Sequence, residues 1–353
     1  MTSPRTVPRA VSARSVVFGA VLIACLLTAC APVGTVPAAS SPTATSPAPR
    51  STFTPPPPTR PTTAVAPLRG SVIPIEAAQR PAVSAKIDNH WDARPQWGID
   101  RADVVVEELV EGGLTRYLAV WQSDLPDRVG PVRSIRPMDP DIVSPFGGII
   151  AYSGGRARFV EMMQEAPVHN AIHGGADDRF MFRTTERRAP HNVILRAPQI
   201  AAEYSDLDAP AAQFRYSSSG WAPLFGEESA GLDLRFSAVS PRSWRWDARS
   251  GAYLRSQDGR PDTAAGGGRI SAANVLVLRV AIDDRYGDVP KTVLVGTGTG
   301  VLSSGGSALP VTWTKASRDA PIVLRNAAGS EVQLAVGNTW IELVPEAGSV
   351  AVL

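Results

Sequence analysis

Charged side chains gather beside predicted turns in the first half of the chain, and arginine and aspartate dominate among them. Arginine pairs with phosphate oxygens through two parallel N–H groups, and aspartate holds Mg²⁺ together with its bound waters. Side chains that follow strand ends often meet at one edge of a sheet. The pattern predicts a ligand-binding site for an anion, made of Asp88, Arg101, Asp103, Arg116, Arg133, Arg136, Asp139, His191 and Asn192.

Such a site could work in two ways, and a third interpretation needs no ligand. As a binding site, it would hold a phosphate-bearing molecule. In a reactive version, Mg²⁺ would neutralise a pyrophosphate, arginines would stabilise developing charge, and an aspartate or His191 would accept a proton. The same pattern is also typical of ion pairs that only fix loops. The catalytic residues, and whether the protein is an enzyme, therefore stay open.

Other candidate motifs predict structure rather than chemistry. His169 and His173 have the i, i+4 spacing of helical metal ligands, but Gly174 follows at once and argues against a helix, so we expect a loop and no metal. A glycine-rich run at 296–300 follows a strand without leading into a helix, which does not support a dinucleotide site. Trp313 and Trp340 are expected in the core.

The elements that must position these residues differ between the two halves of the chain. The first half alternates β-rich stretches at 82–87, 103–109, 114–122, 129–135 and 148–152 with helical spacing at 156–165 and 198–204. The second half contains short β stretches separated by turns. We expect an α+β fold, with an N-terminal mixed sheet with packed helices and a β-rich C-terminal domain.

The N-terminus predicts export and lipid attachment. Basic residues precede a short apolar run at 16–27, which is too short to span a bilayer. The run Leu27-Thr28-Ala29-Cys30 then resembles the lipobox of bacterial lipoproteins. That resemblance implies a signal peptide at 1–29 and lipidation of Cys30, with palmitate-type acyl chains holding the protein at the extracytoplasmic face of the membrane.

The remaining chain divides into a tether and two domains. Residues 30–66 are rich in Pro, Ser and Thr and nearly free of large apolar groups, so they predict a disordered tether. An N-terminal α/β-type domain is expected at 67–222 and a C-terminal β-rich domain at 223–353. The boundary is placed where a Ser-Ser-Ser-Gly run at 217–220 breaks the pattern.

Composition excludes several classes of function. The formal net charge is +2, from 35 basic and 33 acidic residues, which argues against nucleic acid as a partner. The two cysteines are Cys25, which leaves with the signal, and Cys30, which is lipidated. The mature domain would then have no free thiol, which excludes thiol catalysis, disulfides and cysteine zinc sites.

The sequence resembles the YerB-like lipoproteins over nearly the whole folded part. The resemblance rests on the run AVSAKIDNHWDARPQWGIDRADVVVEELVEGGLTRYLAVWQSDLPDRVGPVRSIRP, on AYSGG at 151–155 and APHN at 189–192, and on SWRWD, AANVLVL, VGTGTG, VTWTKASRDAP and VGNTWIELVP in the second half. It implies an N-terminal and a C-terminal domain, both of unknown function. No reaction follows from it.

A second resemblance, to the LytR–CpsA–Psr envelope phosphotransferases, is carried by fewer residues. It involves Asp88, Arg101 with Asp103, the run 134–137 with Asp139, and the Ala-Tyr-x-Gly-Gly element at 151–155. Arg and Pro are swapped in that run, one extra residue precedes its Asp, and the family's later Arg-rich region is not evident. The resemblance implies Arg and Asp side chains that grip a polyprenyl-pyrophosphate-linked glycan.

These observations predict a lipid-anchored envelope protein whose Arg/Asp site binds an anionic cell-wall or lipid-linked precursor. One alternative is a non-catalytic scaffold that presents its β domain to an envelope protein, with structural salt bridges. Another is a Mg²⁺-dependent phosphotransferase resembling the LytR–CpsA–Psr proteins. No cofactor other than Mg²⁺ is indicated.

Overall fold

The computed structural model describes residues 60–217 and 226–353. The described chain from Arg60 onward belongs to one compact unit. The predicted signal peptide, Cys30, most of the tether and the domain boundary near residue 222 lie outside the described residues. No helix in the described part is both long and apolar enough to cross a membrane.

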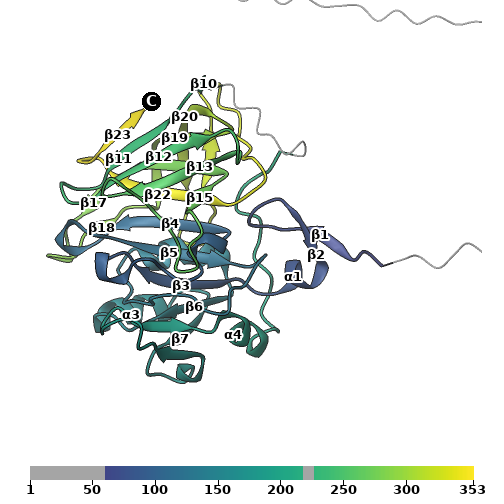
Figure 1. Ribbon diagram of the computed structural model, residues 1–353, viewed down its shortest axis with the longest axis vertical. Coiled ribbons are helices and arrows are strands. Elements are labelled where there is room, and N and C mark those ends of the chain that lie inside the picture. The colour runs from purple at the N-terminus through teal and green to yellow at the C-terminus, as the bar shows by residue number, and fades with distance from the viewer. Residues whose placement is uncertain (1–59, 218–225) are drawn as a thin grey trace, which may run out of the picture. The chain divides into compact units, whose positions relative to one another are not determined.

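An 11-stranded mixed sheet forms the centre of this unit (Figure 1). It takes strands from both halves of the chain, and short β21 (Val323–Arg325) pairs beside β20. In spatial order the other strands are β10 (Glu227–Glu228), β20 (Ser307–Lys315), β19 (Gly296–Ser304), β16 (Asn274–Val280), β22 (Thr339–Pro345), β4 (Val104–Leu109), β5 (Thr115–Trp121), β3 (Val83–Asp88), β6 (Ile149–Tyr152) and β7 (His169–Ile172).

The two halves join where β22 pairs in parallel with β4. Figure 1 shows this strand from near the C-terminus lying along a strand from the first half. The same β22 also pairs in parallel with β16 on its other edge. The predicted 67–222 and 223–353 division stays a prediction, but the strands on its two sides share one hydrogen-bonded sheet.

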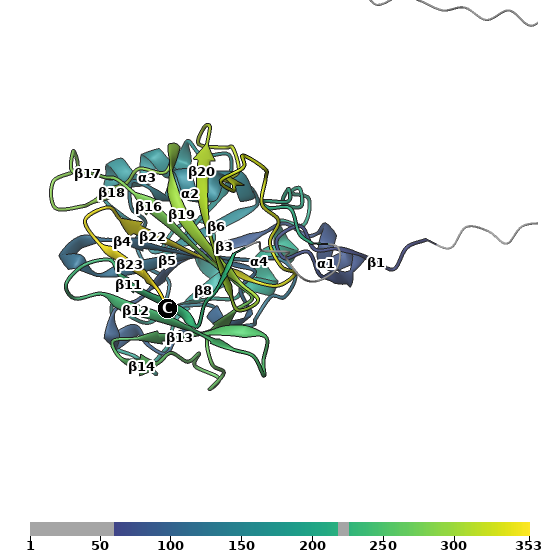
Figure 2. The same cartoon turned by 90° about the horizontal axis from the view of Figure 1, so that it is seen from above.

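A second, antiparallel sheet of six strands covers part of the large sheet (Figure 2). Buried residues of this sheet, including Leu232, Trp244 and Tyr253, belong to the same apolar cluster as Val275 and Trp340 of the large sheet. Its strands are β14 (Arg260–Pro261), β13 (Ala252–Gln257), β12 (Pro241–Asp247), β11 (Gly231–Arg235), β23 (Ser349–Val352) and β15 (Ser271–Ala272).

Helices are few and short, so the strand-rich part of the expected fold class is confirmed, whereas the α+β description with packed helices is not. The longest helix has eight residues. The α-helices are α1 (Ile75–Gln79), α2 (Asp139–Val143), α3 (Ala157–Gln164) and α4 (Ala197–Glu203); the 3-10 turns are η1 (Trp91–Ala93), η2 (Ile99–Arg101), η3 (Glu111–Gly113), η4 (Ser144–Phe146) and η5 (Asp178–Phe180).

Three two-stranded pairs complete the fold: β1 (Thr63–Val65) with β2 (Val72–Pro74), β8 (Met181–Arg183) with β9 (Val193–Leu195), and β17 (Ile282–Asp283) with β18 (Lys291–Thr292). Because β1 begins at Thr63, ordered structure starts before residue 66, where the tether was expected to end. The predicted strand at 129–135 is wrong as a regular strand. It makes isolated bridges through Val129 and Val132, and Pro131 has no N–H to donate to a ladder.

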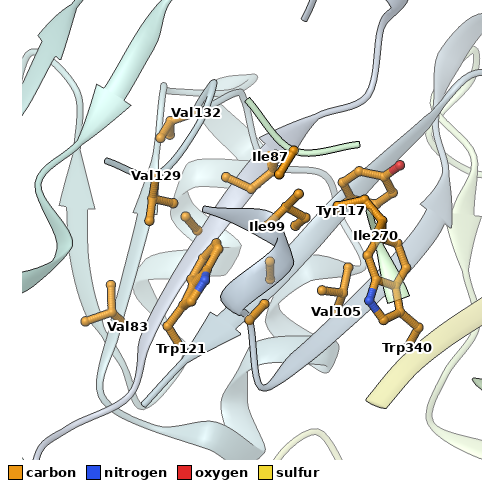
Figure 3. Packing of buried hydrophobic residues seen from close by; sticks show 14 of the residues in the cluster. Val83, Ile87, Ile99, Val105, Tyr117, Trp121, Val129, Val132, Ile270 and Trp340 are labelled. Atoms are coloured by element: carbon orange, nitrogen blue, oxygen red, sulfur yellow. The ribbon is translucent and has the colours of Figure 1, made fainter. Parts of the chain in front are cut away.

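The central strands β3, β4 and β5 are buried on both faces along almost their whole length, and β3 buries the polar residues Ser84 and Lys86 as well as its apolar ones. Successive apolar residues along these strands belong alternately to two separate clusters of buried apolar side chains. Val83, Val105 and Trp121 lie in one cluster (Figure 3), and Val104 and Leu118 lie in the other. Polar residues at the ends of these strands are therefore held on a rigid base.

Candidate functional site

Several of the candidate site residues gather at the carboxyl end of β3. Asp88 is the last residue of β3, and β3 runs parallel to β6. The segment after Val132 continues past this edge, because Arg133 N donates to Lys86 O (2.8 Å) and Ser153 N donates to Arg133 O (2.9 Å). The edge thus collects Asp88, the 133–139 segment and the residues after β6.

Three arginines converge there. Arg116 is the direct cross-strand neighbour of Asp88 on β5. Its Nη1 donates to Ser134 O at 2.8 Å, and Nη1 of Arg136 donates to the same oxygen at 3.3 Å. Nε of Arg133 lies 3.0 Å from the Asp88 carboxylate. We call Arg116, Arg133 and Arg136 the arginine cluster.

The arginine cluster carries more positive charge than its neighbours balance. Two carboxylates pair with it, Asp88 with Arg133 and Glu111 with Arg136 at 2.7 Å, so one guanidinium charge is left over. Burial, followed by repulsion from Arg136, lowers the pKa of Arg116 to about 10. Arg116 therefore stays charged at neutral pH, although it is only 8% exposed.

Glu111 helps to hold the cluster at a loop. Burial alone would raise its pKa, but the hydrogen bond from Arg136 and the surrounding positive charge lower it overall. Among the described residues, the guanidinium of Arg116 donates a hydrogen bond only to the Ser134 carbonyl. Since a guanidinium has five N–H groups, the cluster keeps donors for an anion, and the side chains of Arg133 and Arg136 remain 21% and 11% exposed.

His191 joins the site from the loop before β9. Its Nδ1 lies 2.6 Å from Asp88 Oδ2. The ionised carboxylate only accepts hydrogen bonds, so Nδ1–H donates and Nε2 is left with a lone pair. The ring stacks on His90, with centroids 4.7 Å apart. Burial, followed by repulsion from His191, lowers the pKa of His90.

Asp139 supports the site from beneath. Its Oδ2 accepts a hydrogen bond from Arg136 N at 2.5 Å, and its Oδ1 lies 2.7 Å from Lys86 Nζ. Lys86 also pairs with Glu108, and all three side chains are fully buried. Burial, and then repulsion from Asp139, raises the pKa of Glu108 to about 8, so this carboxyl is mainly neutral at pH 7.

The structure does not bring the other predicted residues to this edge. Asp103 lies at the opposite end of β4, where it accepts hydrogen bonds from the backbone of Gln122 and Ser123. Arg101 lies beside it and pairs with Asp124 at the surface. Asn192 follows His191, but its side chain donates to Thr184 O and accepts from Arg183, which fixes the β8–β9 loop.

Sequence reasoning missed two neighbours of the site, His90 and Asp92. They follow Asp88 closely, and His90 N donates to Asp88 Oδ1 at 3.1 Å. The His-x-Asp spacing directly after a strand end was a usable signal. The loop expected at the other two histidines is wrong for His169, which is the first residue of strand β7 and pairs with Asp177. His173 follows that strand and pairs with Asp178.

These features define a strand-rich protein of two sequence regions that share one sheet and carry a cationic site at its edge. The chain belongs to the YerB-like family. Residues 69–210 match the family described as "Protein of unknown function (DUF3048) N-terminal domain", and residues 232–341 match its C-terminal domain.

Two comparisons agree with this assignment. The chain is 27% identical over 292 residues to the protein named "Putative lipoprotein YerB" of Bacillus subtilis (strain 168), covering 80% of this chain and 86% of that protein. The crystal structure of the YerB protein from Bacillus subtilis shares the fold, with a TM-score of 0.72, 24% identity, and coverage of 82% of this chain and 99% of that one.

Proposed function

We propose that this protein is a lipid-anchored, extracytoplasmic envelope protein that binds an anionic, phosphate-bearing cell-wall or lipid-linked precursor at the arginine cluster. The anchor rests on the lipobox-like run ending at Cys30 and on a relative named as a lipoprotein. The binding site rests on one observation: three charged guanidinium groups meet at a sheet edge with two paired carboxylates.

Phosphate suits this arrangement better than a lone carboxylate would. A phosphate group offers several oxygens and more than one charge, and guanidinium groups match it through paired N–H donors. A buried cation without full compensation is costly, so an anion would stabilise the cluster. The surrounding carbonyls of Ser134 and Ile135 already orient the guanidinium planes of Arg116 and Arg136.

A sugar attached to that phosphate would find an aromatic surface nearby. Trp91 follows His90 directly, contacts its ring at a centroid distance of 3.8 Å, and is 62% exposed. Aromatic rings with one free face stack on apolar faces of other rings. This supports a glycan-bearing phosphate as the ligand class.

The test is a thermal-shift titration of residues 59–353 with a polyprenyl pyrophosphate, with and without Mg²⁺. A ligand at 100 times its Kd stabilises the native state by about 2.7 kcal/mol, which raises Tm by roughly 4–5 °C for a unit of this size. The double variant Arg133→Ala/Arg136→Ala should lose most of the shift. Arg101→Ala is the matched control, because Arg101 pairs with Asp124 at the opposite end of β4.

Each outcome distinguishes the alternatives. A shift lost only in the double variant supports the arginine cluster, and dependence on Mg²⁺ would justify an assay for phosphotransfer. An equal shift in all three proteins would place binding elsewhere. No shift in any of them would overturn the proposal and favour the scaffold, whose arginines are structural.

A further inference from the structure

Beside the arginine cluster, two histidines and an aspartate form a compact group of possible metal ligands. His90, Asp92 and His191 each offer one ligand atom, and these atoms all lie within 4.8 Å of one another. His90 and Asp92 flank Trp91 in the η1 turn, whereas His191 comes from a loop about a hundred residues later in the chain. Within residues 60–217 and 226–353, no other group of three such side chains meets this spacing.

The carboxylate of Asp88 fixes the orientation of His191. It accepts the Nδ1–H of the ring at 2.6 Å, so Nε2 points away with its lone pair free. A histidine that binds a metal through one nitrogen usually donates the other N–H to a carboxylate, which sets the tautomer and makes the ring a better ligand. Asp88 is 3% exposed and is itself held by Arg133 and His90 N.

His90 is also held in place, through the backbone that follows it. Its Nδ1 accepts a hydrogen bond from Asp92 N at 3.2 Å, which begins the η1 turn. Nε2 of His90 has no hydrogen-bond partner in the described part of the chain. The Asp92 carboxylate lies 3.6 Å from the ring and is 64% exposed, so it can rotate toward an ion without breaking a packed contact.

From this geometry we infer that His90, Asp92 and His191 bind one divalent transition-metal ion of the zinc class. Two imidazoles and a carboxylate are ligands that zinc accepts in open sites, where a fourth position stays free for water or an anion. Ligands about 2.1 Å from a tetrahedral ion are roughly 3.4 Å apart, so ligand atoms that lie within 4.8 Å of one another can close on an ion by small side-chain rotations.

The choice of ion follows from the donor set. Imidazole favours zinc, copper, iron and nickel, whereas Mg²⁺ prefers oxygen ligands alone. Two of the neighbouring arginines are paired with carboxylates, Arg133 with Asp88 and Arg94 with Asp258 at 2.6 Å. The inference goes beyond the proposed function, because it requires no anion at the arginine cluster.

The test measures Zn²⁺ binding alone by isothermal titration calorimetry on residues 59–353 that have been treated with chelator and dialysed. The chain has four histidines, so two pairs of substitutions account for all of them. His90→Gln and His191→Gln should each weaken binding at least tenfold. The double variant His169→Gln/His173→Gln is the matched control and should bind as the unchanged protein does, with one ion per chain.

A further variant separates positioning from ligation. Asp88→Asn keeps all three ligands but loses the carboxylate that orients His191, so Zn²⁺ affinity should fall about 10- to 100-fold. Co²⁺ in place of Zn²⁺ should give the visible absorption of a four-coordinate site, and this band should disappear in His191→Gln. Circular dichroism of each variant checks that the fold is kept.

Two results would overturn the inference. One is the absence of stoichiometric Zn²⁺ binding to the unchanged protein, and the other is equal loss in the control pair and in the His90 and His191 variants. The Zn²⁺ titrations contain no anionic ligand, so they test the metal site alone. The thermal-shift assay can be repeated in the presence of chelator, so it tests the arginine cluster alone.

Discussion

Arg255 on β13 makes the strongest test of how the two halves of the chain are held together. Its side chain is fully buried and pairs with Glu107 of β4 and with Asp262. The guanidinium carbon lies 4.9 Å from the ring centroid of Trp340 and 5.5 Å from that of Tyr117. One residue of the second half thus neutralises a buried carboxylate of the first.

Replacing this residue leaves a buried charge with fewer partners. In Arg255→Met, Glu107 would keep Arg242 at 2.8 Å, but its second oxygen would lose its cation. Burial alone would raise the pKa of Glu107, and Arg255 and then Arg242 lower it to about 2. Breaking a buried ion pair from one side costs about 3–5 kcal/mol, and lost cation–π contacts add on the order of 1 kcal/mol.

Urea unfolding measures the loss. With an m-value of about 2–3 kcal/mol/M, this loss of about 4–6 kcal/mol should lower the urea midpoint by roughly 1.3–3 M. Arg245→Met is the matched control, because Arg245 lies on β12 of the same sheet but pairs with Asp233 at the surface, where such a pair contributes about 0–1 kcal/mol. If both variants lost equal stability, the reasoning about the buried network would be refuted.

Three further predictions concern the fold and the anchor. Burial raises the pKa of the Glu108 carboxyl from its usual 4.5 to about 8. The stability that the protonated carboxyl contributes is therefore present below pH 4.5 and is lost as pH rises to 8, and Glu108→Gln should flatten this fall of the urea midpoint with pH. Gly148→Ala should lower the free energy of unfolding by about 2 kcal/mol more than the control Gly147→Ala, as measured by thermal unfolding. Both glycines have positive φ, but a Cβ at residue 148 would lie 2.3 Å from Ala82 O, whereas the described residues leave open space at Gly147. Cys30→Ser should abolish incorporation of labelled palmitate and release the protein from the membrane fraction, and continued labelling would contradict the anchor.

Local patterns predicted the strands that build the site. The apolar runs at 103–109 and 114–122 predicted two strands, which the structure shows as β4 and β5, where Glu108 pairs with Arg116. Asp88 was expected at a strand end, and it lies there. These features depend on neighbours in sequence, through periodicity and turn residues, so one sequence is enough to show them.

The remaining features depend on contacts between distant residues. Nothing in the sequence indicates that β22 pairs with β4, or that His191 meets His90 and Asp88. Arg101 and Asp88 were grouped because both flank strands, but the antiparallel course of β4 and β5 and the position of Arg101 before β4 put them at opposite ends. A single sequence gives the residues at strand ends without showing which ends coincide.

The central claim is that the arginine cluster binds a phosphate-bearing anion. Its most direct test is a crystal structure of residues 59–353 grown with pyrophosphate. We predict phosphate oxygens within hydrogen-bond distance of Arg116, Arg133 and Arg136, with the Arg116 guanidinium making bonds beyond the one to Ser134 O. Pyrophosphate bound elsewhere, or an arginine cluster with unchanged partners at saturating ligand, would contradict the claim.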